Sequence, residues 1–242
     1  MFSGKIEDYI LFEDRDIIVC RKPAGIAVQN ARIGAMDLES SLKNYLASKS
    51  GDGRNMPYLA VIHRLDQPVE GILVFGKTLK AAKELSAQIT SGKMRKIYLA
   101  VTYGQPEYTA VSKNPVILED YLKKDGKTNS SSVVKASTPG AKKARLSYEV
   151  IDETLDKISG KKKWLLRIHL DTGRHHQIRV QLAHAGMPLA GDRKYGEEST
   201  GMREAVNLAL CAASLTFLHP VTQKAMKFET KPETSAFEGF QK

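Results

Sequence analysis

The segment at residues 63–71 combines the acid Asp66 with two basic side chains and a tight turn. It begins with His-Arg-Leu-Asp, is interrupted by a proline and a glycine, and leads into an apolar run at residues 72–75. This pattern predicts that Asp66 lies in a short connection ahead of a buried strand. Catalytic and binding groups concentrate on such connections when a rigid scaffold holds them. A solvated pair of Arg64 and Asp66 on a surface turn would fit the same residues.

A second segment, residues 93–104, carries side chains that could work with this acid. Its apolar and polar residues alternate as in a strand, and the alternation places Lys96 and Tyr98 on one face. A ring beside a cation suits an extruded nucleobase, because the ring stacks on the base while the cation meets phosphate. Tyr98 would equally suit an amphipathic strand with a buried ring and a wet hydroxyl.

The third segment, residues 171–186, is basic and rich in histidine. A capping residue at its start and a glycine at its end predict a helix over the whole segment. Helical spacing would place His175 and Arg179 on one side. The three histidines lack the His-x-x-x-His spacing of a helical zinc site, and no carboxylate is interleaved. The sequence therefore predicts no metal site.

The composition narrows the class of protein. Hydrophobic residues make up 42% of the 242 residues and charged residues 26%, as in a globular chain. The formal charge of +10 favours a polyanionic partner, nucleic acid before membrane. Cys20 and Cys211 stand in apolar surroundings, which favours buried free thiols in a reducing compartment. Because the sequence shows neither a signal core nor a long apolar run, we expect a cytoplasmic protein without membrane contact.

The remaining pattern predicts the elements that position these groups. Asp37 and Thr78 are the expected N-caps of two packing helices. Residues 120–126 and 128–140 are rich in Lys, Ser, Thr and Gly and are expected to form loops. Strands arrive as hairpins with interspersed helices and without strict βαβ alternation. This favours an α+β fold with a mixed, mostly antiparallel β-sheet flanked by helices and loops.

These segments, in this order, resemble the RluA-like family of pseudouridine synthases. The matching motifs are Lys-Pro-x-Gly at 22–25, His-Arg-Leu-Asp at 63–66 with Gly71, Lys-x-Tyr at 96–98, Thr-Gly-Arg-x-His-Gln-Ile-Arg at 172–179 and Gly-Asp-Arg-Lys-Tyr-Gly at 191–196. The resemblance covers residues 17–228. It implies the pseudouridine synthase fold and an enzyme that isomerises uridine to pseudouridine in structured RNA, either ribosomal or transfer RNA, with no cofactor and no metal.

The resemblance also implies roles for individual residues. Asp66 would be the catalytic carboxylate, Tyr98 would contact the target uracil, and Arg179 would pair with the acid and favour its ionised form. Arg64 would fill the space left by a flipped nucleotide. The other RNA-binding residues that we expect are Lys96, Arg174, His176 and Leu210.

We expect a single catalytic domain over residues 1–242, with a polar, peripheral tail at 230–242. Fewer than 20 residues precede the first strand, so no amino-terminal S4-like RNA-binding module is expected. The catalytic domain would then bind RNA itself. We expect it to act as a monomer without an obligate protein partner. The strongest departure from the family pattern is Val69-Glu70, where Thr-Ser is commoner.

Two other classes of function compete with the isomerase. A non-catalytic basic RNA-binding module would explain the charge but gives no role to a lone acid in a tight turn. A glycoside hydrolase usually needs two facing carboxylates, and no second acid accompanies the motifs. The sequence leaves open which RNA and uridine are modified, whether the route is a glycal or an acylal, and what the basic loops 121–145 and 160–163 do.

Overall fold

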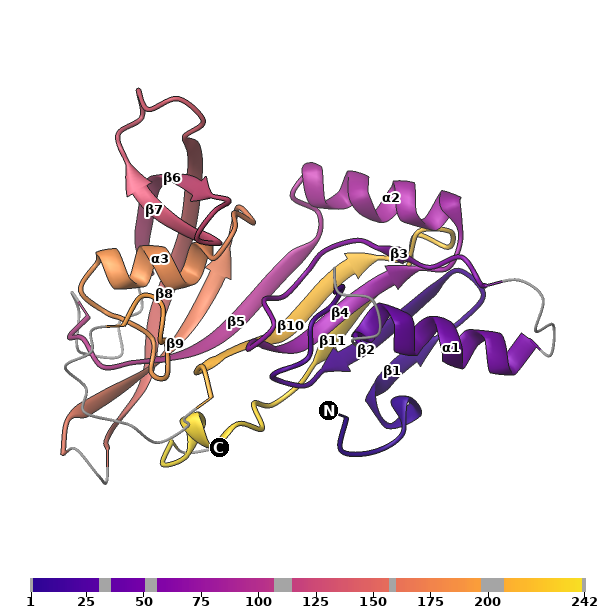
Figure 1. Ribbon diagram of the computed structural model, residues 1–242, viewed down its shortest axis with the longest axis horizontal. Coiled ribbons are helices and arrows are strands. Elements are labelled where there is room, and N and C mark those ends of the chain that lie inside the picture. Colours follow the sequence, from indigo (N-terminus) through magenta and orange to yellow (C-terminus); the bar gives the residue numbers. More distant parts are fainter. Residues whose placement is uncertain are drawn as a thin grey trace. The chain divides into compact units, whose positions relative to one another are not determined.

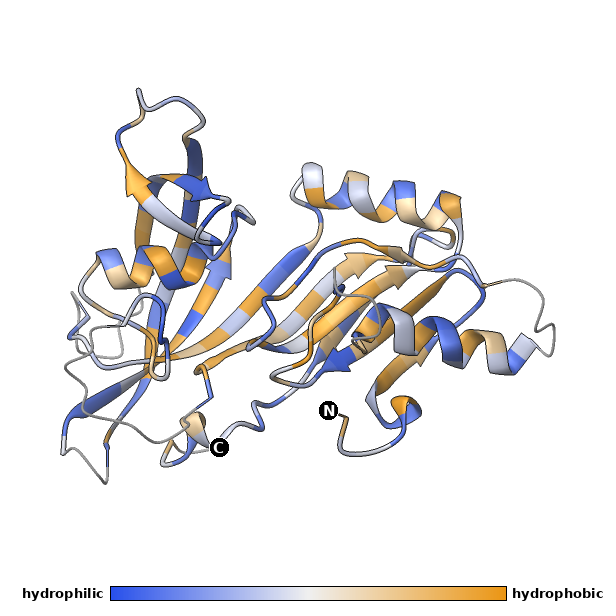
Figure 2. Cartoon of the chain, viewed as in Figure 1, coloured by the Kyte–Doolittle hydropathy of each residue, from blue (hydrophilic) through white to orange (hydrophobic). Residues whose placement is uncertain are grey.

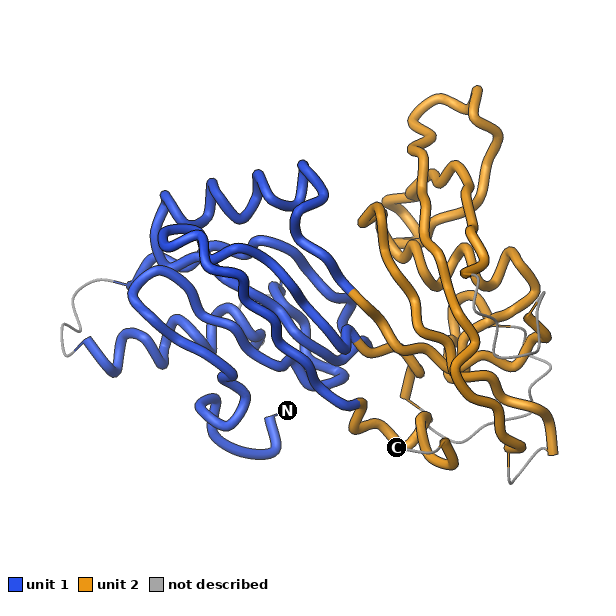
Figure 3. Tube along the Cα trace, turned by 180° about the vertical axis from the view of Figure 1, so that it is seen from behind, with its two compact units in different colours: residues 1–96, 212–231 blue, residues 97–211, 232–242 orange. Residues whose placement is uncertain are grey.

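The computed structural model describes residues 2–30, 36–50, 56–106, 115–156, 160–196 and 207–240. They fall into two compact units (Figures 1 and 3), with residues 1–96 and 212–231 in unit 1 and residues 97–211 and 232–242 in unit 2. The described residues contain 11 β-strands and three α-helices, which confirms the predicted α+β class. None of the helices among them is long and apolar enough to cross a membrane.

Unit 1 is a sheet with two α-helices. Its elements are the 3-10 helix η1 (Ile6–Tyr9), β1 (Ile10–Glu13), β2 (Ile17–Lys22), α1 (Leu38–Ser50), β3 (Ala60–Val61), β4 (Glu70–Gly76), α2 (Leu79–Thr90) and β11 (Ala225–Glu229), with parts of β5 (Arg95–Thr102) and β10 (Leu210–Leu218). The strand order is β1-β2-β4-β10, with β3 on β4 and β11 on β10. β2 runs antiparallel to β4, and the register sets Lys22 opposite Gly71.

Both faces of the central strands of unit 1 are buried. On one face, Leu85 of α2 packs in a cluster with Val19 and Val74. Ile18 and Phe75 point to the opposite face by strand alternation, and they are fully buried as well. Figure 2 shows the apolar colouring concentrated on these strands. β4, the strand that follows the Asp66 connection, therefore belongs to a well-packed core.

The two helices of unit 1 begin where the sequence predicts. Asp37 Oδ1 accepts the backbone N–H of Ser40 at 2.7 Å, just before α1. Thr78 Oγ1 accepts the backbone N–H of Ala81 at 3.1 Å and caps α2. Each bond satisfies a donor that the first turn of a helix leaves without a partner, so both predicted caps are confirmed.

Unit 2 is a second antiparallel arrangement of strands. Besides the remaining parts of β5 and β10, its elements are β6 (Val116–Asp125), β7 (Ser130–Val134), β8 (Lys142–Leu155), β9 (Lys162–Leu170), α3 (Gln177–His184) and the 3-10 helix η3 (Ser235–Phe237). The strand order is β5-β9-β8-β6-β7, and neighbouring strands in this order are antiparallel.

The prediction of loops at residues 120–126 and 128–140 is wrong over much of its length, because β6 and β7 form a hairpin there. β6 also pairs with β8, so this polar stretch is held on both sides. One face is apolar, since Leu122 packs with Ala144 and with Val180 of α3. Lys123, Lys124 and Ser132 are exposed, and polar residues of this kind made the segment resemble a loop.

The predicted helix at residues 171–186 is shorter than expected. His176 has a left-handed backbone conformation, with φ +53°, and α3 begins only at Gln177. The side-chain oxygen of Gln177 accepts the hydroxyl of Thr172 at 2.8 Å and the backbone N–H of Arg174 at 2.9 Å. The residues before the helix are therefore folded back as a turn, and the prediction that His175 shares a helix face with Arg179 is wrong.

The last described residues, 235–240, pack within unit 2. Ala236 is buried with Val101 and Ala209, and Phe237 and Phe240 pack against the same cluster. Part of the segment expected to be peripheral thus covers apolar side chains. Cys20 and Cys211 are both buried and form no disulfide in the described part of the chain, as predicted.

Candidate active site

In unit 1, Asp66 lies half-buried on a turn between β3 and β4. The backbone N–H of Val69 donates to the Asp66 carbonyl at 3.0 Å and closes the turn. Its neighbour Gln67 accepts the N–H of Gly25 at 2.9 Å, and the Gln67 side chain donates to the Gly25 carbonyl at 3.0 Å. The acid is therefore carried by a turn that is fastened to the loop after β2.

Lys22 also connects the Asp66 turn to the loop after β2. Its side chain is fully buried, and the Nζ atom donates to the carbonyls of Pro23 at 3.0 Å, Ile26 at 2.7 Å and Gln67 at 3.0 Å. Burial lowers the pKa of Lys22 to about 7, against the opposing attraction of nearby acids. A buried ammonium with three carbonyl acceptors ties the two loops together.

The motif glycine, Gly71, is required by the backbone. Its φ is +128°, which L side chains rarely adopt. A Cβ at this position would come within 2.4 Å of the Ala212 carbonyl oxygen. The start of β4 therefore has no room for a side chain here.

His63, the first residue of the His-Arg-Leu-Asp motif, is neutral. Its Nε2 accepts the backbone N–H of Val74 at 3.4 Å, so Nδ1 carries the proton. Burial, with a smaller contribution from the charge of Lys96, lowers the pKa of His63 to about 3. The buried Nδ1 atom finds no hydrogen-bond partner in the described part of the chain. His63 supports the turn and is a poor general acid.

Lys96 and Tyr98 both lie on β5, as predicted. Tyr98 is buried and stands opposite Ile168 of β9 in unit 2. Lys96 is the last residue of unit 1, and burial lowers the pKa of its ammonium. The predicted strand is thus present, although burial does not follow the predicted alternation, because Tyr98 is buried while Ile97 and Leu99 are half-buried.

Arg179 on α3 is buried and is held by an acid that we did not predict. Its Nε and Nη2 donate to the two carboxylate oxygens of Asp192, each at 2.8 Å. Burial raises the pKa of Asp192, but the hydrogen bonds and charge of Arg179, with backbone N–H groups, outweigh it and hold the pKa below its usual value. The pairing of Arg179 with Asp66 stays a prediction, because the two residues belong to different units.

Tyr195 supports the same guanidinium and joins it to the β6–β7 hairpin. The Arg179 guanidinium carbon lies 5.1 Å from the centre of the Tyr195 ring. The Tyr195 hydroxyl accepts the backbone N–H of Ser131 at 2.8 Å and contacts His176 Nδ1 at 2.7 Å. Either the hydroxyl or the ring nitrogen can donate in the contact with His176, because the hydroxyl still has a lone pair and a proton after it accepts from Ser131. Arg179 is therefore fixed from two directions.

The other predicted RNA-binding residues occupy different environments. Arg64 is exposed beside Asp66 in unit 1. In unit 2, Arg174 is exposed and donates from Nε to the Lys143 carbonyl at 2.9 Å, while His176 is buried. Leu210 is buried at the start of β10. Their contacts with RNA stay predictions.

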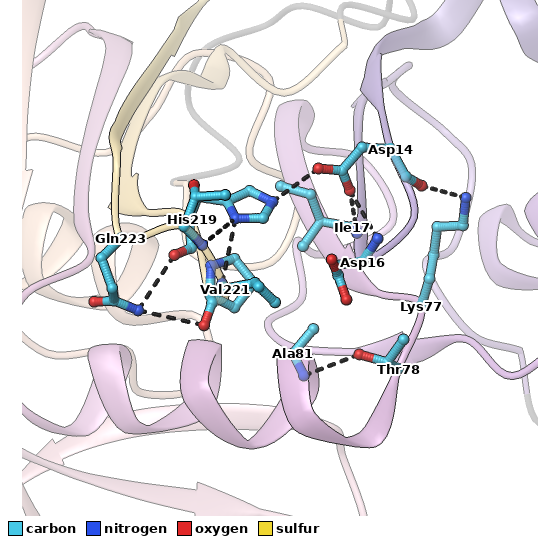
Figure 4. Close-up of polar contacts among 11 residues, drawn as sticks. Asp14, Asp16, Ile17, Lys77, Thr78, Ala81, His219, Val221 and Gln223 are labelled. Carbon is cyan, nitrogen blue, oxygen red and sulfur yellow. Dashed lines mark hydrogen bonds and ion pairs between the residues drawn. The ribbon is translucent and has the colours of Figure 1, made fainter.

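One cluster in unit 1, Asp14, Asp16 and His219, has the composition of a metal site, with ligand atoms within 4.8 Å of one another. The hydrogen bonds in Figure 4 explain it without an ion. His219 Nδ1 accepts two backbone N–H groups, and Nε2 donates to Asp14 Oδ2 at 2.8 Å. The other Asp14 oxygen accepts the N–H groups of Asp16 and Ile17. The cluster ties the β1–β2 turn to the β10–β11 turn.

Sequence reasoning missed the roles of Asp192 and Tyr195. Both belong to residues 191–196, which the sequence marked only as a turn similar to the family pattern. Their functions depend on contacts with α3 and β7 that no local pattern records. An acid and an aromatic ring on a glycine-bounded turn after a basic helix were the available signal.

The fold and the family are shown by comparison with known proteins. The human RNA pseudouridylate synthase domain containing 1 protein shares the fold, with a TM-score of 0.74, 20% identity, and coverage of 96% of this chain and 86% of its own. The human domain containing 4 protein gives a TM-score of 0.72 at 20% identity, over 93% of this chain and 89% of its own. The chain thus has the fold of pseudouridine synthases.

The sequence comparison narrows this class to a family. A family model described as RNA pseudouridylate synthase matches residues 16–184. Ribosomal large subunit pseudouridine synthase D of Pseudomonas aeruginosa is 31% identical over 93% of this chain and 68% of its own length. Synthase C of Escherichia coli is 32% identical, over 93% and 66%. The chain belongs to the RNA pseudouridylate synthase family, a family of RNA uridine isomerases. It spans about two thirds of the length of these curated relatives.

Proposed function

We propose that this chain isomerises uridine to pseudouridine in ribosomal RNA and that Asp66 is the reacting carboxylate. The observation that carries the proposal is the construction of the Asp66 turn. Four hydrogen bonds fix this turn, one within it and three to Gly25 and Lys22. A surface acid in a solvated pair would need no such support. Related proteins named as ribosomal large subunit synthases support ribosomal RNA as the substrate class.

The proposed reaction requires the protein mainly to position the reacting groups. The N1–C1′ bond breaks, the uracil turns, C5 bonds to C1′, and the C5 proton is removed while N1 gains one. Asp66 either attacks C1′ or takes the 2′ proton, and both routes begin with an ionised carboxylate. Because no group is gained or lost, the proposal requires no metal or cofactor.

Tyr98 and Arg179 have supporting roles in this proposal. The buried Tyr98 would hold the uracil by ring contact and assist removal of the C5 proton. Arg179 would supply the positive charge that faces Asp66. The Asp192 carboxylate and the Tyr195 ring, which already fix the guanidinium, would hold it ready for this contact. Preorganised charge is effective because it needs no rearrangement during the reaction.

The charge distribution supports an RNA partner. Residues 121–145 contain seven Lys or Arg side chains and one Asp, which places a net charge of +6 of the chain's +10 on one hairpin and the following strand. Among the described residues, five of these lysines form no ion pair, namely Lys123, Lys124, Lys127, Lys135 and Lys142. Such a surface suits backbone phosphates, which are bound without regard to sequence.

The target nucleotide must leave its stack before Asp66 can reach the sugar. Arg64 is exposed two residues before the acid, and in this proposal its side chain would occupy the vacated position. The enzyme would act in the cytoplasm as a monomer, without an obligate protein partner. Light scattering of the purified chain with and without RNA tests the oligomeric state.

The substrate class is tested by mapping pseudouridines in ribosomal and transfer RNA from cells with and without this chain. We expect loss of one or more ribosomal RNA sites, restored by the wild-type chain and not by Asp66→Asn. Loss of sites only in transfer RNA would overturn the substrate class. An unchanged map, with RNA binding intact, would favour the competing hypothesis of a non-catalytic RNA-binding module.

A further inference from the structure

We propose that Lys194 is a positioning residue for RNA binding: its side chain holds the turn of the basic β6–β7 hairpin against the turn that anchors Arg179. This inference rests on the proposed function, because that function gives the hairpin its RNA partner. All of the residues involved lie in unit 2, where β7 lies beside α3 (Figure 1).

The first step is the contact between Lys194 and the hairpin. The chain reverses direction at residues 126–129, between the end of β6 and the start of β7. Lys194 Nζ donates to the backbone carbonyls of Thr128 and Asn129 in this turn, each at 3.0 Å. Two of the three N–H donors of the ammonium are therefore used to hold the hairpin. Both bonds are charge-assisted, which makes them stronger than bonds between neutral groups.

The second step is the support at the other end of Lys194. Its backbone N–H donates to Asp192 Oδ1 at 2.9 Å, and the same oxygen accepts Arg179 Nη2 at 2.8 Å. The neighbouring Tyr195 adds a second attachment, because its hydroxyl accepts the Ser131 N–H of β7 at 2.8 Å. The hairpin turn is thus linked through one residue to a buried ion pair.

The third step is the conformation that the turn must keep. Asn129 has a left-handed backbone, with φ +48°, which is uncommon for residues other than glycine. Such a conformation persists where the surrounding contacts hold it. Lys194 holds the Asn129 carbonyl, and His175 Nε2 contacts the Asn129 side-chain oxygen at 3.2 Å. The side chain of Lys194 is therefore part of what fixes the turn.

The fourth step is what a fixed turn does for RNA binding. Lys123, Lys124 and Lys127 are exposed on the hairpin. Their like charges repel one another, so an unsupported hairpin would spread them apart. A loop that is already ordered in its bound form avoids the cost of ordering it during association. Lys194 therefore raises the affinity for RNA through the turn and not by contact with a phosphate.

The contact is tested without RNA, by hydrogen exchange of the Ser131 amide, because this N–H bonds to Tyr195 and reports whether the hairpin is attached. In Lys194→Met it should exchange about tenfold faster, as for the loss of one or two hydrogen bonds. Lys194→Arg should keep the wild-type rate, because a guanidinium also donates to carbonyls. An unchanged rate in Lys194→Met overturns the proposal. Faster exchange throughout β9 as well would indicate a general loss of stability and would overturn it too.

The consequence for RNA is tested by the affinity for a transcribed domain of large-subunit ribosomal RNA at several salt concentrations. In Lys194→Met the affinity should fall about threefold to tenfold, with the slope of log affinity against log salt unchanged. Lys194→Arg should restore the affinity. The matched control is Lys127→Met, which removes the same charge from the turn itself and should lower the slope by about 0.7, as for one phosphate contact.

Two results would overturn the positioning role. A slope lowered by about 0.7 in Lys194→Met would make Lys194 a direct phosphate contact. In turnover the loss should appear in KM for ribosomal RNA, so a loss confined to kcat would also contradict the proposal. If the wild-type chain binds no RNA or forms no pseudouridine, the proposed function fails, and the exchange of the Ser131 amide still decides whether Lys194 holds the hairpin.

Discussion

The buried pair of Arg179 and Asp192 gives a quantitative prediction. The Arg179 side chain is 8% exposed and that of Asp192 is 1% exposed, and two charge-assisted bonds join them. Asp192→Asn keeps the size of the side chain but removes the charge and turns an N–H donor toward the guanidinium. Breaking such a buried pair costs about 3–5 kcal/mol, and the ring of Tyr195 stays in place, so we expect about 3 kcal/mol.

The size of the chain converts this loss into a melting temperature. For a chain of 242 residues, each kcal/mol corresponds to about 2–4 °C, so Asp192→Asn should melt about 6–12 °C below wild type. Urea unfolding gives the free energy of unfolding directly. The matched control is Asp171→Asn, whose ion pair with Arg145 is 3.4 Å long and about half exposed, and which should cost less than about 1 kcal/mol.

The pH dependence of this difference supplies a second check. Because the pKa of Asp192 is lowered in the folded chain, its contribution is fully present above the unfolded value of about 4 and is lost as the pH falls through the folded value. The gap between wild type and Asp192→Asn should therefore be constant near neutral pH and narrow below about pH 4. A cost under about 0.5 kcal/mol at pH 7, or a gap that widens in acid, would refute the reasoning.

Two further predictions concern the hairpin and the motif glycine. Replacing Lys123, Lys124 and Lys127 with Gln should lower the slope of log affinity for RNA against log salt by about 2, at about 0.7 per phosphate contact, and an unchanged slope would remove the hairpin from the interface. Gly71→Ala should lose at least about 3 kcal/mol of stability by urea unfolding, because the new Cβ meets the backbone of Ala212. The control is Gly126→Ala, where a Cβ meets nothing within 4 Å. Equal stabilities of the two variants would contradict the account.

Local signals were enough to predict the two helix caps of unit 1 and the buried strand that follows Asp66. Asp37 and Thr78 accept backbone N–H groups only three residues away, so their role as helix caps can be predicted from the adjacent sequence. The late start of α3 was not predictable in this way. It depends on the left-handed conformation of His176, whose ring contacts Tyr195 nineteen residues further along the chain.

In the candidate site, too, features that depend on neighbouring residues were predictable, and contacts between distant residues were not. The location of Asp66 on a short connection ahead of β4 was predictable, because the turn, Gly71 and the strand are contiguous in the sequence. The contact of Arg179 with Asp192 was not predictable in this way, because the two residues lie 13 positions apart, and the pairing of Arg179 with Asp66 stays a prediction. The role of Lys22 was equally hidden, because its third acceptor lies 45 residues away and a Lys-Pro-x-Gly turn needs no buried ammonium.

The most direct measurement is the amount of pseudouridine that the purified chain forms in ribosomal RNA, compared between wild type and Asp66→Asn at matched RNA occupancy. Our account predicts that the variant binds RNA within about twofold of wild type while its turnover falls by at least about a thousandfold, as for other enzymes that lose a reacting group. Turnover by Asp66→Asn within tenfold of wild type would contradict it.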